Sequence, residues 1–265
     1  MRRDQEFAAL HAGPGLLVLP NAWDAGSAGV IEAAGAKAIA TSSAAVSWRY
    51  GYPDETLPFD KLVATVAEIV RVVRIPVSAD IVDGCVADGA SVEDPVARIL
   101  DAGAVGVNIE DGTKAPDLLA KKIEQARAVA ARQGIALWIN ARTDVYLRSL
   151  VPAPQAFEEC VRRADLYRRA GADSIFVPAL KGSDDIARMV RAVGLPLNLL
   201  AWDGVPDAAT LVQLGVRRLS AGGWLARAAY NRTFADAKAF LAEGRVGIFT
   251  SPEISVPPLN DLFRR

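Results

Sequence analysis

The sequence contains few of the side chains that most metalloenzymes and nucleophilic hydrolases use. His11 is the only histidine, and Cys85 and Cys160 are the only cysteines, in 265 residues. Because His11 precedes the first predicted strand, the sequence supports neither a Ser-His-Asp triad, a Cys-His dyad nor a histidine-rich zinc site. Two cysteines supply no disulfide scaffold and no four-thiolate zinc site, and such scarcity is typical of a protein from a reducing cytoplasm.

Net charge and long apolar segments are also scarce. The net charge is -1, which predicts no nucleic-acid partner and no anionic membrane partner. Met1-Arg2-Arg3 is soon followed by Asp4 and Glu6, which fits neither a signal peptide nor a membrane span, so we expect a soluble cytoplasmic protein. No glycine-rich phosphate loop follows the first predicted strand, which argues against a dinucleotide site.

Short apolar runs and helical patterns alternate along the whole chain. Apolar residues make up 51% of the sequence, which is enough for a full hydrophobic core. Most runs are continuously apolar, as expected for parallel strands covered on both faces. Helical patterns between them include 59–73, 116–132 and 156–170. We predict eight strands, at 16–20, 38–41, 76–80, 106–110, 136–141, 174–178, 197–200 and 218–220. Eight such units favour an α/β fold of the (β/α)₈ TIM-barrel type, with residues 1–265 as a single domain.

A weak repeat marks the points where helices end and strands follow. Gly35, Gly103 and Gly171 each lie between two alanines before a predicted strand, and Gly215 holds the same place later in the chain. Glycine there supplies the left-handed residue that ends a helix. After the last strand, 223–265 is predicted to be a C-terminal helix (223–243) and tail, and the tail segment 254–263 could pack on a neighbouring subunit or on its own barrel.

Three charged residues stand at the ends of successive predicted strands. Asp80, Glu110 and Arg142 follow the third, fourth and fifth apolar runs. Since active sites of (β/α)₈ barrels form at the carboxyl ends of the strands, these side chains are expected to share one pocket. Two carboxylates on adjacent strands favour a hard cation, Mg²⁺ or Mn²⁺. The alternative is that each is a hydrogen-bonded acid at a strand end or a helix N-cap.

Further candidates surround these three residues. Arg142 can bind a substrate carboxylate or a developing oxyanion through two parallel hydrogen bonds, or form an ion pair with Asp144 or Glu110. The small residues of 41–44, including Ser42, Ser43 and Ala44, leave hydroxyls and backbone N–H groups free to hold a carboxylate. Asp54 either reaches the site from a loop or belongs to a turn, and Asp24 is predicted to be a helix N-cap.

With these motifs in order, the chain resembles the isocitrate lyase/phosphoenolpyruvate mutase superfamily over nearly its whole length. The segments that carry the resemblance are Pro20-Asn21-Ala22-Trp23-Asp24, 42–54, Val77-Ser78-Ala79-Asp80, Asn108-Ile109-Glu110-Asp111-Gly112, Asn140-Ala141-Arg142-Thr143-Asp144 and 170–178. The resemblance implies a (β/α)₈ barrel, and a homotetramer in which the last helix is swapped between subunits. It also implies Mg²⁺ and the making or breaking of a C–C or P–C bond beside a 2-oxo acid, through an enolate.

The resemblance also assigns residue roles. It implies that Asp80 and Glu110 belong to the metal site, that Arg142 contacts substrate, that Ser42, Ser43 and Ala44 hold its carboxylate, and that Asp54 lies near the waters of the metal. Two departures matter. Val82 stands where relatives have a second acid, with Asp83 one residue displaced, so either Asp83 also serves the metal or the site is weaker. The Lys-Cys-Gly-His loop of the lyases is absent, and Gly112-Thr113-Lys114 leads directly into a helix.

Three functions remain open on these grounds. The leading hypothesis is a Mg²⁺-dependent lyase or decarboxylase-like enzyme that acts on a small 2-oxo or 2-hydroxy dicarboxylate. The first alternative is a phosphonopyruvate-type mutase or hydrolase. The second, motivated by Val82, is a barrel that binds a small carboxylate without turnover.

Overall fold

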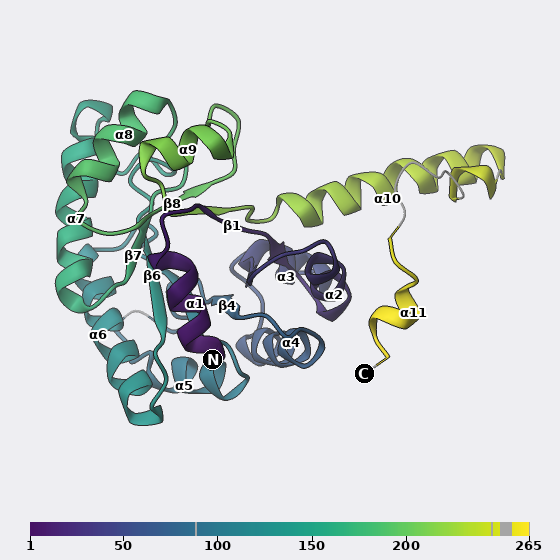
Figure 1. Cartoon of the computed structure of the whole chain (residues 1–265), viewed down its shortest axis with the longest axis horizontal. Helices are drawn as coiled ribbons and strands as arrows, with labels where there is room; N and C mark the ends of the chain where they lie inside the picture. Colours follow the sequence, from purple (N-terminus) through teal and green to yellow (C-terminus); the bar gives the residue numbers. More distant parts are fainter. Residues whose placement is uncertain (88, 245, 250–255, 265) are drawn as a thin grey trace.

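The computed structural model describes residues 1–87, 89–244, 246–249 and 256–264, and its strands form a single parallel sheet. The order β1-β9-β8-β7-β6-β5-β4-β3-β2 follows the chain around a nearly closed barrel, and every neighbouring pair is parallel (Figure 1). The strands are β1 (Leu17–Leu19), β2 (Asn21–Ala22), β3 (Ile39–Thr41), β4 (Val77–Asp80), β5 (Gly106–Glu110), β6 (Trp138–Arg142), β7 (Ser174–Phe176), β8 (Leu197–Leu200) and β9 (Arg218–Ser220). The predicted (β/α)₈ fold is confirmed.

The first predicted strand is divided into two short ones. β1 pairs only with β9 and β2 pairs only with β3, so this one stretch of chain joins the two sides of the barrel. Pro20 lies between them, and it has no N–H to donate to a ladder. Its carbonyl still accepts the amide of Ala40 at 3.1 Å. The division therefore comes from one residue and leaves the eight-unit topology intact.

Most of the helices lie between successive strands and cover the outside of the barrel. The helices are α1 (Arg3–Ala12), α2 (Ala25–Ala33), α3 (Ser43–Arg49), α4 (Phe59–Val72), α5 (Glu93–Asp101), α6 (Pro116–Gln133), α7 (Ala156–Ala170), α8 (Ser183–Ala192), α9 (Ala208–Leu214), α10 (Trp224–Glu243) and α11 (Leu259–Leu262), with 3₁₀ turns at Ala153–Gln155 and Val246–Phe249. Their apolar faces and the strands build one main core that runs from Val46 to Val216. Asp24 caps α2 by accepting the amide of Ser27 at 2.7 Å, as predicted.

The repeated glycines end helices at the amino-terminal side of the strands. Gly35, Gly103, Gly171 and Gly215 all have positive φ, between +84° and +107°, which confirms the predicted left-handed residues. At Gly103 a Cβ atom would also lie 2.7 Å from Cγ1 of Val70. Any side chain there would combine backbone strain with a steric clash. These positions are structural and lie opposite the carboxyl ends of the strands.

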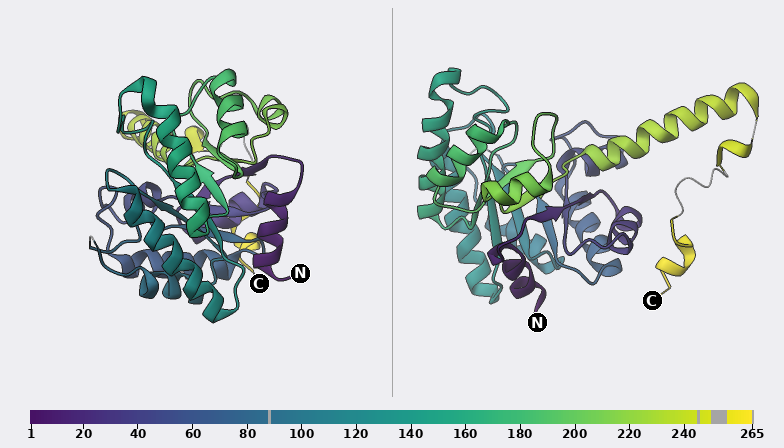
Figure 2. Two further views of the ribbon diagram at one scale, coloured as in Figure 1. Left: turned by 90° about the vertical axis from the view of Figure 1, so that its left-hand side faces the viewer. Right: turned by 45° about the horizontal axis from the view of Figure 1, so that its top comes forward.

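The long helix α10 leaves the barrel instead of packing on it. Figures 1 and 2 show it extending outward, and Ala226 is its only buried residue in the described part of the chain. Phe234 is 72% exposed and Leu241 is 85% exposed. Of the predicted tail segment 254–263, residues 254 and 255 lie outside the described residues, while the Phe263 ring lies against Gly29 of α2. Within this chain, the end of the tail therefore packs on its own barrel.

His11 closes the amino-terminal end of the barrel. Its ring stacks on Trp138, with ring centres 4.1 Å apart, and its Nδ1 lies 2.8 Å from the carbonyl of Phe7. Burial, together with the positive charge of Arg218, lowers the pKa of His11 to about 3. The only histidine is thus a neutral core residue, distant from the carboxyl ends of the strands.

The burial of neutral His11 predicts that the fold becomes less stable in acid. Between the ordinary pKa of 6.5 and about 3, the unfolded chain binds a proton at His11 and the folded chain does not. The free energy of unfolding should therefore fall as the pH is lowered through this window, by up to ~1.4 kcal/mol per pH unit from this residue. We expect His11→Phe to remove this part of the slope in urea titrations between pH 6.5 and 5. A variant with an unchanged slope would contradict the prediction.

Candidate active site

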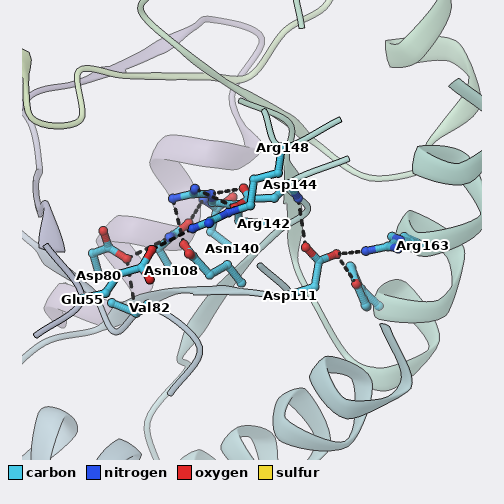
Figure 3. Close-up of polar contacts among 12 residues, drawn as sticks. Glu55, Asp80, Val82, Asn108, Asp111, Asn140, Arg142, Asp144, Arg148 and Arg163 are labelled. Carbon is cyan, nitrogen blue, oxygen red and sulfur yellow. Dashed lines mark hydrogen bonds and ion pairs between the residues drawn. The ribbon is translucent and has the colours of Figure 1, made fainter. Parts of the chain in front are cut away.

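The three charged residues predicted at strand ends occupy the last positions of β4, β5 and β6. Parallel pairing places Glu110 beside Arg142, and Asp80 beside Asn108. Nη1 of Arg142 lies 2.8 Å from Oε2 of Glu110, and Asn108 connects the β5 strand to Asp80 (Figure 3). The structure thus brings Asp80, Glu110 and Arg142 to one place, because adjacent parallel strands end at the same edge of the barrel.

Asp80 is held in a fixed orientation by three donors. Its Oδ2 accepts the amide of Ser43 at 3.0 Å, and its Oδ1 accepts Nδ2 of Asn108 at 3.0 Å and the amide of Val82 at 3.4 Å. Its own amide donates to the Thr41 hydroxyl at 2.8 Å. These contacts tie β4 to the segment after β3, so the carboxylate faces the centre of the site with little rotational freedom.

Behind Asp80 a chain of polar side chains crosses the barrel interior. Nδ2 of Asn140 donates to Oδ1 of Asn108 at 3.0 Å, and the hydroxyl of Ser174 donates to Oδ1 of Asn140 at 2.7 Å. Trp138 completes the chain by donating to Ser174 at 2.9 Å. Our sequence reasoning missed these residues. Their signal is period-two spacing, since Asn108 precedes Glu110, and Asn140 precedes Arg142, by two residues on the same face of a strand.

Arg142 is bound on both sides by carboxylates. Its Nε and Nη2 donate to the two oxygens of Asp144 at 2.7 and 3.0 Å, while Nη1 faces Glu110. Asp144 also accepts Nε of Arg148 at 2.8 Å, and Arg148 reaches Glu55 at 2.7 Å (Figure 3). Both ion pairs that the sequence offered for Arg142 are present. The guanidinium is therefore oriented rigidly at the edge of the site.

The carboxylates of the site raise one another's pKa values. The pKa of Glu110 is raised to about 8, chiefly by burial and also by the charges of Asp80 and Asp144, against the opposing charge of Arg142. Burial and then the charge of Asp80 raise the pKa of Asp54. Carboxyl groups gathered in this way stabilise a bound cation or retain protons near neutral pH.

Two cavities meet at Ser43 and Asp80. The first, of about 290 Å³, extends into the barrel and is lined by Ser42, Ala44, Asp54, Arg142 and other residues, with Trp48, Trp202 and Trp224 around its opening. The second, of about 420 Å³, lies on the α4 side and is lined by Glu110, Asp83, Cys85 and Lys114 among others. The indoles of Trp202 and Trp224 pack edge to face, with centres 5.5 Å apart. Bulky indole side chains therefore form part of the wall of the first cavity.

Asp83 lines the same cavity as Asp80, but its carboxylate is paired with lysine side chains. The Asp83 carboxylate forms an ion pair with Lys114, and Nζ of Lys122 donates to the Asp83 carbonyl at 2.5 Å. Val82, one residue earlier, has a left-handed φ of +54°, its amide donates to Asp80, and its carbonyl accepts the amide of Glu110. At the position where relatives have an acid, this chain therefore uses backbone atoms to connect β4 with β5.

The contacts of the remaining predicted residues limit what each can do in the site. Ser42 caps α3 by accepting the amide of Ala45 at 3.4 Å, so its hydroxyl is already engaged. Ser43 and Ala44 line the first cavity beside Asp80. Cys85 lines the second cavity, where burial raises the pKa of its thiol to about 12 and its Sγ donates to the Ile81 carbonyl. Cys85 is therefore an unreactive thiol.

The donor set fits Mg²⁺ bound through few protein ligands. Asp80 and Glu110 line one cavity, and the negative charge of Asp80 raises the pKa of Glu110. Within the described ranges, no group of three or more histidine, cysteine, aspartate or glutamate side chains could enclose a metal ion. Mg²⁺ commonly keeps several waters and takes only one or two carboxylates, so this arrangement suits it better than zinc.

Comparison with known proteins establishes the class. The family model described as phosphoenolpyruvate phosphomutase matches residues 7–241. The chain belongs to this family, within the isocitrate lyase/phosphoenolpyruvate mutase superfamily. The protein is accordingly an enzyme of a superfamily of lyases and mutases.

Individual relatives differ in their reactions. The chain is 35% identical over 218 residues to an uncharacterized protein of Mycobacterium tuberculosis, covering 82% of this chain and 81% of that one. It is 32% identical to 2-methylisocitrate lyase of Aeropyrum pernix, over 69% of this chain and 60% of that enzyme. A crystal structure of a proposed lyase or mutase from Burkholderia cenocepacia J2315 has 32% identity and a TM-score of 0.88, covering 99% of this chain and 96% of that one.

Other similarities concern the fold alone. Phosphonopyruvate hydrolase, solved with oxalate and Mg²⁺, has 24% identity and a TM-score of 0.85 over 99% of this chain and 95% of that one.

No helix within the described residues is both long and apolar enough to span a bilayer.

Proposed function

We propose that this protein is a Mg²⁺-dependent lyase or decarboxylase that breaks a C–C bond beside a 2-oxo or 2-hydroxy carboxylate through an enolate. The observation that carries the proposal is the junction of Asp80, Glu110 and Arg142 at the carboxyl ends of adjacent strands. The relatives named 2-methylisocitrate lyase and oxaloacetate decarboxylase support a reaction of this type.

Asp80 and Glu110 are the residues that would hold the metal, and Asp83 is held by lysines instead. When bound, Mg²⁺ supplies a Lewis acid for the 2-oxo or 2-hydroxy oxygen. The substrate carboxylate would lie against Ser43 and Ala44, which line the first cavity beside Asp80. The tryptophans around the opening would limit access of water.

Arg142 and Asp54 complete the proposed reaction. In decarboxylation, the C–C bond to the leaving carboxylate breaks and CO₂ departs. The electron pair of that bond remains on the substrate and forms the enolate. The Arg142 guanidinium, fixed by Glu110 and Asp144, stabilises that negative charge. Asp54 lines the same cavity as Arg142 and would deliver the proton that the enolate carbon takes up.

Calorimetry tests the metal requirement. We expect Mg²⁺ and Mn²⁺ to bind, and oxalate, a planar stand-in for the enolate, to bind at least ~10-fold more tightly in their presence. Absence of metal binding with and without oxalate would overturn the mechanism. Turnover of oxaloacetate and phosphonopyruvate, followed by carbon and phosphorus NMR, separates C–C from P–C bond chemistry.

We also infer that α10 swaps between subunits of a homotetramer. The exposed Tyr230, Phe234 and Leu241 would be covered by a neighbouring barrel, which would offset the cost of exposing this helix. Size-exclusion chromatography with light scattering should give four times the mass of the 28.1 kDa chain. A monomeric mass would contradict the inference.

A further inference from the structure

A buried arginine lines the first cavity and has no acidic partner among the described residues. Arg218, on β9, is 2% exposed and lines the cavity together with Ser78 and Ala40. Its Nε donates to the Ser220 hydroxyl at 3.0 Å, and its Nη1 is buried without a hydrogen-bond partner. No ion pair joins it to any carboxylate in the described part of the chain.

The position of Arg218 follows from strand register. Arg218 and Ser220 are two residues apart on β9, so they share the inner face of the barrel. Interiors of such barrels are normally filled by branched apolar side chains. Here the position opposite Arg218 on β8 is the fully buried Asn198, whose Oδ1 accepts the Ser220 hydroxyl at 3.2 Å. The barrel interior at β8 and β9 is therefore polar.

Two further polar atoms near this position lack partners. Nδ2 of Asn198 and the hydroxyl of Ser78 are buried and make no hydrogen bond among the described residues. The same holds for Nη1 of Arg218 and for Nε2 of His11. Buried polar groups are normally hydrogen-bonded, and a buried cation is normally paired, because either one alone is costly. Among the described residues, the Arg218 guanidinium lacks an anion that would pair with it.

The electrostatic surroundings of Arg218 agree with the absence of an anionic partner among the described residues. Burial lowers the pKa of Arg218 to about 9, so the guanidinium stays protonated at neutral pH, and only the charge of Asp80 opposes the shift. Arg142 differs from Arg218, since its guanidinium is paired with Glu110 and Asp144. The uncompensated positive charge of the cavity interior is thus on Arg218.

We propose that Arg218 is a specificity-determining residue that binds the second carboxylate of a dicarboxylate substrate. This inference rests on the proposed function, which places the first carboxylate at Ser43 and Ala44. The guanidinium would donate to it from the side that lines the first cavity. A carboxylate suits this group because its two oxygens accept parallel hydrogen bonds from a guanidinium.

Matched ligands test the inference without turnover. L-Malate and L-lactate share the 2-hydroxy carboxylate and differ in the second carboxylate. Binding is measured by calorimetry in Mg²⁺ and in EDTA, for the full chain and for Arg218→Met, Arg218→Lys and Arg227→Met. Arg227 is the control because it lines the same cavity but is exposed at its opening.

We expect the unmodified chain to prefer malate over lactate. Arg218→Met should weaken malate binding by about 10- to 100-fold and leave lactate binding unchanged, in keeping with loss of a charged hydrogen bond. Arg218→Lys should retain part of the preference, and Arg227→Met all of it.

An equal effect of Arg218→Met on both ligands, or none on malate, would overturn the inference. The two proposals fail separately. Loss of metal dependence counts against the proposed function, whereas a malate preference that does not depend on Arg218 counts against this subsite. Since Arg218→Met removes an unpaired buried charge, the variant is expected to fold with a thermal midpoint at least as high as the parent.

Discussion

Replacing Asp80 with asparagine is expected to lower kcat/KM by about 10³-fold or more and to abolish Mg²⁺ binding. Asp80 lines both cavities, and its carboxylate accepts hydrogen bonds from the amide of Ser43 and the side chain of Asn108. Asparagine keeps the size of the side chain but removes its charge, and it turns one acceptor into a donor facing another donor. Loss of one preorganised electrostatic contact alone commonly costs 10²- to 10³-fold in rate, and the metal contribution adds to it.

The matched control for this experiment is Asp83→Asn. Asp83 lines the second cavity, but its carboxylate is paired with Lys114 and lies 3.7 Å from Nζ of Lys122. We expect a change of less than ~10-fold in kcat/KM and unchanged Mg²⁺ affinity, because the substitution removes no proposed metal ligand. If Asp83→Asn removed metal binding and Asp80→Asn did not, the assignment of the metal residues would be reversed.

Replacing Asp111 with alanine is expected to destabilise the fold by about 3–5 kcal/mol, because it leaves a buried charge without its partner. Asp111 is 1% exposed, and its Oδ2 accepts Nη1 of Arg163 at 2.8 Å and the Tyr167 hydroxyl at 2.6 Å (Figure 3). Its Oδ1 accepts the amide of Asp144 at 2.9 Å. The substitution should therefore disturb Asp144, which orients Arg142, and reduce activity in addition to stability.

Tyr167→Phe is the control for the Asp111 experiment. It removes one hydrogen bond to the same carboxylate and leaves the ion pair with Arg163 in place. We expect a loss of about 1–2 kcal/mol in urea unfolding with little change in kcat/KM. Equal losses for the two variants would show that the hydrogen bond from Tyr167, and not the buried charge of Arg163, accounts for the stability.

The proposed mechanism assigns different roles to the two halves of the site. The rigid half consists of Arg142, Asp144 and Asp111, which successive ion pairs and hydrogen bonds hold in place. The other half gathers Asp54, Asp80 and Glu110, where burial and then the charge of Asp80 raise the pKa values of Asp54 and Glu110. Fixed groups suit stabilisation of a developing charge, and groups with raised pKa suit cation binding and proton transfer.

The sequence by itself determined the barrel and the strand ends at which chemistry occurs. Apolar runs at regular spacing and glycines before the strands are local signals, and a parallel barrel has one edge at which every strand ends. The spacing alone therefore predicts that Asp80, Glu110 and Arg142 lie together. His11, set before the first strand, was correctly kept out of the site for the same reason.

Only the tertiary structure decided which of these groups are engaged and which remain without partners. Asp83 is adjacent to the site in sequence, yet Lys114 and Lys122 from a distant segment hold it. The sequence alone does not distinguish Arg218 from other charged residues in short strands. A strand pattern gives the face on which a side chain lies, but it does not show which charged side chains on other strands lie near it. Burial and long-range pairing set the electrostatics of a site, and both arise only when the strands close on one another.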